Sequence, residues 1–122
     1  MEKLAKMVLL ADFYGPLLTE KQQNVWDLHY QQDLSLAEIA EVENISRQAI
    51  HDLLKRTERI LADYEEKLGL VQRFWAEREK LMKVQALLHG LNEQDYSSRS
   101  AWECHQQIST MVDDVFINIS AV

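Results

Sequence analysis

The sequence predicts an all-α protein. The chain has only 3 glycines and 1 proline among 122 residues, which favours long helices and leaves few turns for a sheet. Residues that can cap helices stand just before stretches with apolar side chains at helical spacing. Hydrophobic residues make up 47% of the chain, enough for a core, but a chain this short is only marginally stable alone, which favours self-association.

Local signals mark the first three helices. The first is expected over residues 2–14, because Met7, Leu10 and Tyr14 recur at helical spacing and Gly15-Pro16 follows. Capping boxes then predict the starts of the second and third helices. In each box the first side chain caps the helix, while the second side chain reaches back to the backbone amide of the capping residue. The pairs are Thr19 with Gln22 and Ser35 with Glu38.

The later helices are longer. Ser46 can cap a fourth helix that runs without a breaker to about Leu68 and ends at Gly69. A fifth is expected over about residues 71–89. Residues 92–100 read as a polar linker, and residues 101–116 as a short last helix.

The third and fourth helices have the spacing of a helix-turn-helix. Ala40 is small where two such helices approach closely, and Asn44 stands where the turn requires a left-handed backbone. Ile39, Ile45, Ile50 and Leu53 are apolar where the helices must pack together. We therefore expect a helix-turn-helix domain over residues 1–68 and a C-terminal helical extension over residues 69–122. We expect this extension to be the region for dimerisation or partner binding.

The fourth helix would be the recognition helix. If Ala49, Ile50, Leu53 and Thr57 face inward, polar residues face outward along its first turns, where such helices meet base edges. Gln48 suits adenine, Arg47 suits guanine or a phosphate, and the later cations suit backbone phosphates. The predicted DNA-binding residues are Ser46, Arg47, Gln48, His51, Asp52, Lys55, Arg56 and Arg59.

Charge is distributed unevenly over this motif. The whole chain carries a formal net charge of -7. Residues 19–45 hold six acidic side chains and one basic, whereas residues 46–59 hold four basic and two acidic. We expect DNA affinity to be modest and strongly salt-dependent, because the acidic supporting helices repel phosphates. A helix-turn-helix that docks on proteins, with these cations as an ordinary solvated surface, is the alternative interpretation.

Catalysis finds little support in the sequence. The four histidines are scattered, with no pair at ligand spacing, and there is no glycine-rich phosphate loop. Cys104 and His105 are neighbours on a predicted helix, so their side chains diverge. We expect no enzyme activity, no metal and no cofactor. With one cysteine and no export or membrane segment, the chain is expected to be cytoplasmic, without membrane insertion.

A heptad pattern suggests self-association. Leu54, Leu61 and Leu68 recur every seven residues, with Ile50, Thr57 and Tyr64 at the offset of a seam. Alternatively, the fifth helix folds back and covers this stripe. We expect internal packing near the domain and a homodimer through the later helices, with Trp75 and Trp102 as candidate anchors.

The stretch from Leu18 to Leu61 resembles region 4 of the sigma-70 family, which reads the -35 promoter element. With "ADFYGPLLTEKQ" before it and "KRTERILADYEEKLGL" in and after it, the chain resembles more closely the YlxM family of small bacterial proteins associated with the signal recognition particle. The likeness covers about residues 7–75. It implies a sigma-70 region 4-like helix-turn-helix with DNA binding and a regulatory role. It also implies a link to the targeting pathway, including an accessory role in docking on signal recognition particle components, its RNA or its GTPase.

The chain departs from the family pattern before the recognition helix. The family has a bulky apolar residue followed by glycine, where this chain has Glu43-Asn44. Val42 is expected to supply the missing packing. Beyond about residue 90 no family pattern is found, so the resemblance implies no function for that segment.

Overall fold

The structure is a computed structural model that describes residues 1–120. Within these residues the chain forms α-helices and two short 3-10 helices, and no strand. The elements are α1 (Lys3–Tyr14), η1 (Gly15–Leu17), α2 (Glu20–Tyr30), α3 (Leu36–Glu43), α4 (Arg47–Leu68), α5 (Leu70–His89), η2 (Glu93–Asp95) and α6 (Arg99–Ser120). The all-α fold is confirmed. Among the described helices, none combines the length and the apolar character of a membrane-spanning segment.

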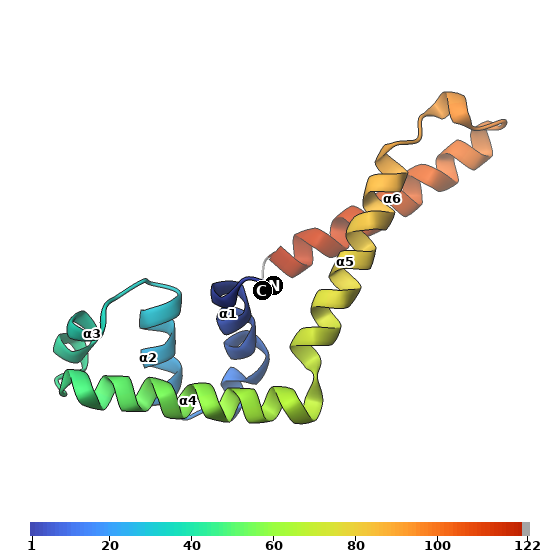
Figure 1. The fold of residues 1–122 in the computed structure, drawn as a ribbon. Helices are drawn as coiled ribbons and strands as arrows, with labels where there is room; N and C mark the ends of the chain where they lie inside the picture. The colour runs from blue at the N-terminus through green and yellow to red at the C-terminus, as the bar shows by residue number, and fades with distance from the viewer. Residues whose placement is uncertain (121–122) are drawn as a thin grey trace. The chain divides into compact units, whose positions relative to one another are not determined.

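The chain divides into two compact units, Met1–Gln72 and Arg73–Val122. In the first, α1, α2 and α3 lie along one side of the long α4 (Figure 1). Their inward side chains form one core, which includes the predicted set Met7, Leu10 and Tyr14. Trp26 lies in this core at 1% exposure, and its indole Nε1 donates a hydrogen bond to the Met7 carbonyl, 3.1 Å away.

Local signals begin and end the helices of the first unit as predicted. Both capping boxes are formed, with Thr19 accepting from the Gln22 amide and Ser35 from the Glu38 amide. Gly69 ends α4 in the left-handed conformation, with φ of 63°. A side chain three residues from its partner needs no tertiary contact to begin a helix, so these signals can be found in the sequence.

One packing prediction for this unit is wrong. Val42 is 64% exposed and does not supply packing at the turn. The internal packing expected of the heptad stripe is confirmed for its first part, because Leu54 and Leu61 belong to the core formed with α1, α2 and α3. Leu68, at the end of the stripe, is 49% exposed.

The junction between α4 and α5 is held by a contact that the sequence did not predict. Glu65 Oε1 accepts a hydrogen bond from the Tyr14 hydroxyl at 2.6 Å. The same carboxylate accepts from the amides of Val71 and Gln72, at 3.0 Å each, so it caps the start of α5. These bonds tie α1 to the first turn of α5.

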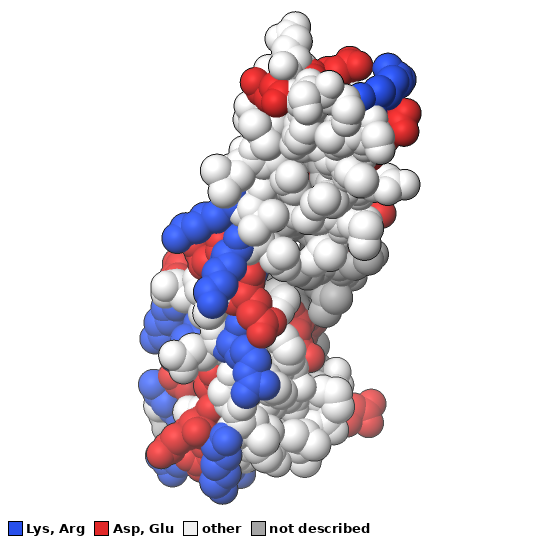
Figure 2. All heavy atoms as spheres, turned by 90° about the vertical axis from the view of Figure 1, so that its right-hand side faces the viewer, with Lys and Arg blue, Asp and Glu red and all other residues white. Residues whose placement is uncertain are grey.

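The second unit is a helical hairpin. α5 and α6 run in opposite directions and are joined by residues 90–98, which include η2 (Figure 1). Gln85 donates a hydrogen bond to Asp113, 2.8 Å away, and thereby links the two helices. Figure 2 shows a broad area over these helices without Lys, Arg, Asp or Glu.

The last helix is longer than predicted. It begins at Arg99, because the Ser98 hydroxyl accepts a hydrogen bond from the Ala101 amide and so ends the linker two residues early. Tyr96, in the linker, donates to or accepts from His105 Nδ1 at 2.8 Å and packs beside Trp102. Cys104 is exposed while His105 is buried, so their side chains diverge as expected.

Candidate nucleic-acid interface

The turn between α3 and α4 has the backbone that the sequence predicts. Asn44 adopts φ 56° and ψ 42°, and its amide donates to the carbonyls of Ala40 and Glu41. Asparagine is the non-glycine side chain that enters this left-handed region most readily. Two residues later the Ser46 hydroxyl accepts from the Ala49 amide at 3.1 Å and caps α4. Three residues therefore turn the chain from one helix into the next.

One side of α4 is fixed in the core. Ile39 of α3 and Ile50 of α4 are both fully buried, which sets the packing of the two helices. Thr57 is also buried and satisfies its hydroxyl by donating to the Leu53 carbonyl at 2.8 Å. Because these side chains hold one face of α4 inward, they determine which side chains the opposite face presents.

The predicted DNA-binding residues of α4 lie on that opposite face, and Ser46 caps the start of the helix. At about 100° per residue the seven residues from Arg47 to Arg59 fall within roughly half of the helix circumference. Every one of them is exposed: Ser46, Arg47, Gln48, His51, Asp52, Lys55, Arg56 and Arg59. The structure thus brings them together on one surface, which we call the α4 face.

Asp52 organises the centre of the α4 face. Its Oδ1 accepts a hydrogen bond from Gln48 Nε2 at 3.0 Å and lies 3.3 Å from His51 Nδ1. Two side chains suited to base edges are therefore oriented by one carboxylate. Asp52 also places a negative charge where DNA phosphates or base acceptors would approach.

The arginines of the α4 face are available for a ligand. Within residues 1–120, Arg47, Arg56 and Arg59 make no hydrogen bond or ion pair to another side chain. Lys55 is exposed and lies 4.0 Å from the half-buried Glu58, at the limit of an ion pair. Guanidinium groups without protein partners are suited to phosphate oxygens and guanine edges.

Two residues outside the motif extend this surface. Lys3 of α1 and His29 of α2 line a small cavity of about 170 Å³ together with His51 and Lys55. His29 Nδ1 is 2.9 Å from the Leu34 carbonyl, which fixes its ring. No sequence pattern predicts this grouping, because Lys3 is far from the motif along the chain and only tertiary packing brings it close.

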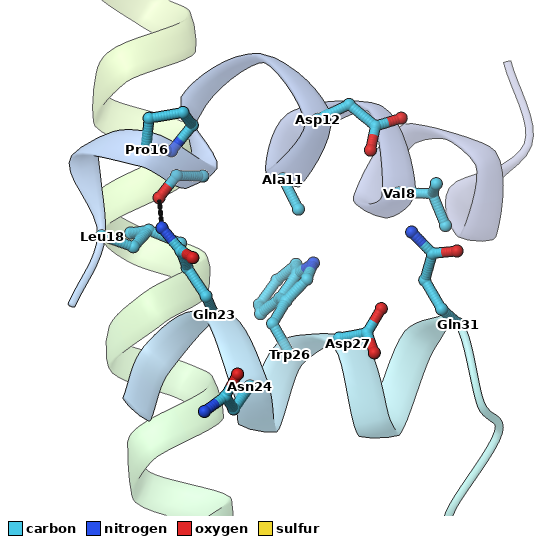
Figure 3. Close-up of a pocket in the computed structure, with 11 residues that line it drawn as sticks. Val8, Ala11, Asp12, Pro16, Leu18, Gln23, Asn24, Trp26, Asp27 and Gln31 are labelled. Carbon is cyan, nitrogen blue, oxygen red and sulfur yellow. Dashed lines mark hydrogen bonds between the residues drawn. The ribbon is translucent and has the colours of Figure 1, made fainter. Parts of the chain in front are cut away.

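The larger groove of this unit lies elsewhere. It measures about 420 Å³ and is lined by α1, η1 and α2, with Trp26 at its floor (Figure 3). Gln23 spans one end by donating to the Gly15 carbonyl. Asp12 and Asp27 supply its carboxylates, and burial raises the pKa of Asp12. None of the predicted DNA-binding residues lines it, so it is separate from the α4 face.

Comparison with known proteins identifies relatives along most of the chain. A UPF0122 protein of Desulforamulus reducens is 56% identical over 90 residues, covering 74% of this chain and 77% of the relative. One from Clostridium novyi is 45% identical over 98 residues, covering 80% and 83%. One from Bacillus velezensis is 46% identical over 95 residues, covering 78% and 86%.

The family model extends further than the sequence motifs suggested. It matches residues 1–103, which includes α5 and the start of α6. The family pattern was expected to end near residue 90, so that boundary was placed too early. The chain belongs to the UPF0122 family, described as "Putative helix-turn-helix protein, YlxM / p13 like".

Proposed function

We propose that this protein is a DNA-binding regulatory protein that contacts duplex DNA through the α4 face. The proposal includes a cytoplasmic location, which access to DNA requires. It also includes a binding role in place of a catalytic one. The observation that supports it most is the position of Arg47, Arg56 and Arg59, which are exposed and unpaired on a helix whose other side is fixed in the core.

The helix geometry supports base contacts at the start of α4. Recognition helices place their N-terminal residues in the major groove, and here those residues are Arg47, Gln48 and His51. Arg56 and Arg59 lie further along, where contacts to the phosphate backbone are expected. Because Arg47, Arg56 and Arg59 would release counterions from the phosphates that they neutralise, binding should weaken steeply as salt rises. Asp52 and the acids of α2 and α3 repel phosphates and should keep the affinity modest.

The test is fluorescence anisotropy of the full chain against a pool of random DNA duplexes, titrated over salt. Arg47→Glu should weaken binding by at least about tenfold and lower the salt slope by about 1, because one cation no longer meets a phosphate or base. Lys67→Glu is the matched control. It makes the same charge change on the same helix, roughly 30 Å further along. Unchanged binding by Arg47→Glu, with saturable binding by the unmodified chain, would refute the proposed face.

A second candidate is an accessory role in the signal recognition particle pathway. The exposed carboxylates of α2 and α3, including Glu20, Glu38 and Glu41, favour a basic partner. Labelled signal recognition RNA and the purified GTPase should be titrated under the same conditions. No duplex binding at low salt, together with binding to either component, would favour this candidate and leave the helix-turn-helix as a docking scaffold.

A further inference from the structure

The helical hairpin buries almost none of its apolar side chains. Every fully buried apolar residue of the described chain lies at Val71 or earlier. Between residues 73 and 117 the only buried side chain is His105, at 6% exposure. Helices are stable in water when they bury an apolar stripe against another element, and a two-helix unit offers each helix a single neighbour. The hairpin therefore lacks a core of its own.

α5 carries two apolar stripes. The inner stripe, which includes Leu81 and Leu88, is half-buried. The outer stripe consists of Val84, Leu87 and Leu91, with exposures of 41%, 73% and 41%. Each outer residue is at the spacing of three or four that keeps side chains on one side of a helix.

α6 repeats this arrangement. Its inner stripe includes Trp102, Val112 and Phe116, which are half-buried. Its outer stripe contains Ile108, Met111 and Val115, with exposures of 50%, 67% and 38%. Two apolar stripes on one helix are typical of a bundle in which every helix contacts two neighbours.

The two outer stripes lie on the same side of the hairpin. On each helix the outer stripe precedes the inner one by one residue, for example Leu87 before Leu88 and Met111 before Val112, which is a rotation of about 100°. Because α5 and α6 run in opposite directions, equal rotations in sequence turn both outer stripes toward the same side (Figure 1). Asp113, bonded to Gln85 and 3.2 Å from His89, places the two stripes at the same level.

The side chains of the two outer stripes carry no formal charge. Residues 84–92 and 104–112 contain no Lys, Arg, Asp or Glu, and Figure 2 shows the uncharged area. The outer stripes offer no cation to bind nucleic acid and no opposite charge to bind a strongly charged protein. A second copy of this acidic chain, in contrast, could approach this surface without like charges meeting across it.

We propose that a second copy of this chain covers this outer face, formed by Val84, Leu87, Leu91, Ile108, Met111 and Val115. Hairpin docked on hairpin completes a four-helix bundle, in which each helix gains its second neighbour. A two-fold axis brings the same patch from both copies together, so a single self-complementary face suffices. The inference is independent of DNA binding by the α4 face, and the dimer would carry two recognition helices.

The first test is sedimentation equilibrium over a wide concentration range. The unmodified chain should be a dimer. Leu87→Asp and Met111→Asp should each raise the dissociation constant by roughly a hundredfold, because two carboxylates enter the interface per dimer. Ile117→Asp is the matched control, since Ile117 is 66% exposed on α6 but lies off the outer stripe. A chain that is monomeric up to millimolar concentration, or Asp variants that dimerise like the control, would overturn the proposal.

The second test needs no substitution. Cys104 is exposed and occupies the next position of the outer stripe toward the start of α6. Alkylation of its thiol should slow as the protein concentration rises through the dissociation constant of the dimer. Circular dichroism should show, over the same range, whether the hairpin loses helix on dissociation. An alkylation rate that is independent of concentration while the chain dimerises would place the interface elsewhere.

Discussion

The contact between Tyr14 and Glu65 offers the sharpest test of how the first unit is held together. The Tyr14 ring is 1% exposed, and its hydroxyl both donates to Glu65 at 2.6 Å and accepts from the Leu70 amide at 3.2 Å. Tyr14→Phe removes this hydroxyl and keeps the ring, which stacks on Tyr64 at 5.8 Å between centroids. The substitution therefore isolates the hydrogen bonds from the packing.

A hydrogen bond to a charged group contributes about 1.5–3 kcal/mol to stability. Tyr14→Phe should accordingly lower the free energy of unfolding by about 2 kcal/mol. For a unit of this size each kcal/mol lowers the melting temperature by roughly 4–8 °C. The value should not reach the upper limit, because Glu65 keeps the Val71 and Gln72 amides as partners.

Urea unfolding of the full chain measures this difference. Tyr64→Phe is the control, because Tyr64 lies at the same junction and makes no hydrogen bond within the described residues. A double-mutant cycle with Glu65→Gln should give a coupling of about 1 kcal/mol or more. A Tyr14→Phe variant as stable as the Tyr64→Phe variant, with no coupling to residue 65, would refute the reasoning.

Three further predictions concern charge and backbone. Burial raises the pKa of Glu65, but hydrogen bonds and the charge of Lys6 outweigh burial, so that the pKa is lowered. The ionised Glu65 therefore stabilises the fold above the ordinary glutamate pKa, and this stabilisation is lost as pH falls through the lowered value. Glu65→Gln should accordingly flatten the acid side of a curve of unfolding free energy against pH. Asn44→Ala should cost about 1 kcal/mol in urea unfolding because φ is 56°, whereas Asn44→Gly should cost nothing; equal stabilities would argue against left-handed strain. Asp52→Asn should strengthen duplex binding at low salt by about threefold or more, since it removes a negative charge from the α4 face; weaker binding in anisotropy would mean that orienting Gln48 matters more.

The local structure of the first unit could be predicted because its determinants are close in sequence. Ser35 and Ser46 each accept from an amide three residues away, and Asn44 and Gly69 adopt their left-handed conformations at helix ends. The exposure of the α4 face could be predicted for a related reason, since helical periodicity separates the inward residues from the outward ones.

Contacts between distant segments could not be predicted in this way. Tyr14 and Glu65 are 51 residues apart, and neither residue type alone indicates a buried hydrogen bond. The role of Asp52 was also missed, although Gln48 precedes it by four residues, because an i, i+4 pair on an exposed face competes with solvent and with DNA. Helical periodicity marked Asp52 as an outward-facing site residue without indicating that it orients its neighbours.

The heptad pattern of α4 shows why periodicity alone misplaces an interface. A repeat of Leu54 and Leu61 indicates that some element covers this stripe, but the repeat is the same whether that element is a second chain or α1, α2 and α3 of the same chain. Only the structure distinguishes them, and here both leucines are in the core. α5 and α6 each carry two apolar stripes. Their uncovered outer stripes can be identified only once the structure shows which stripes face each other within the hairpin. Dimerisation through the later helices stays a prediction, and its proposed face is the uncharged side of the hairpin.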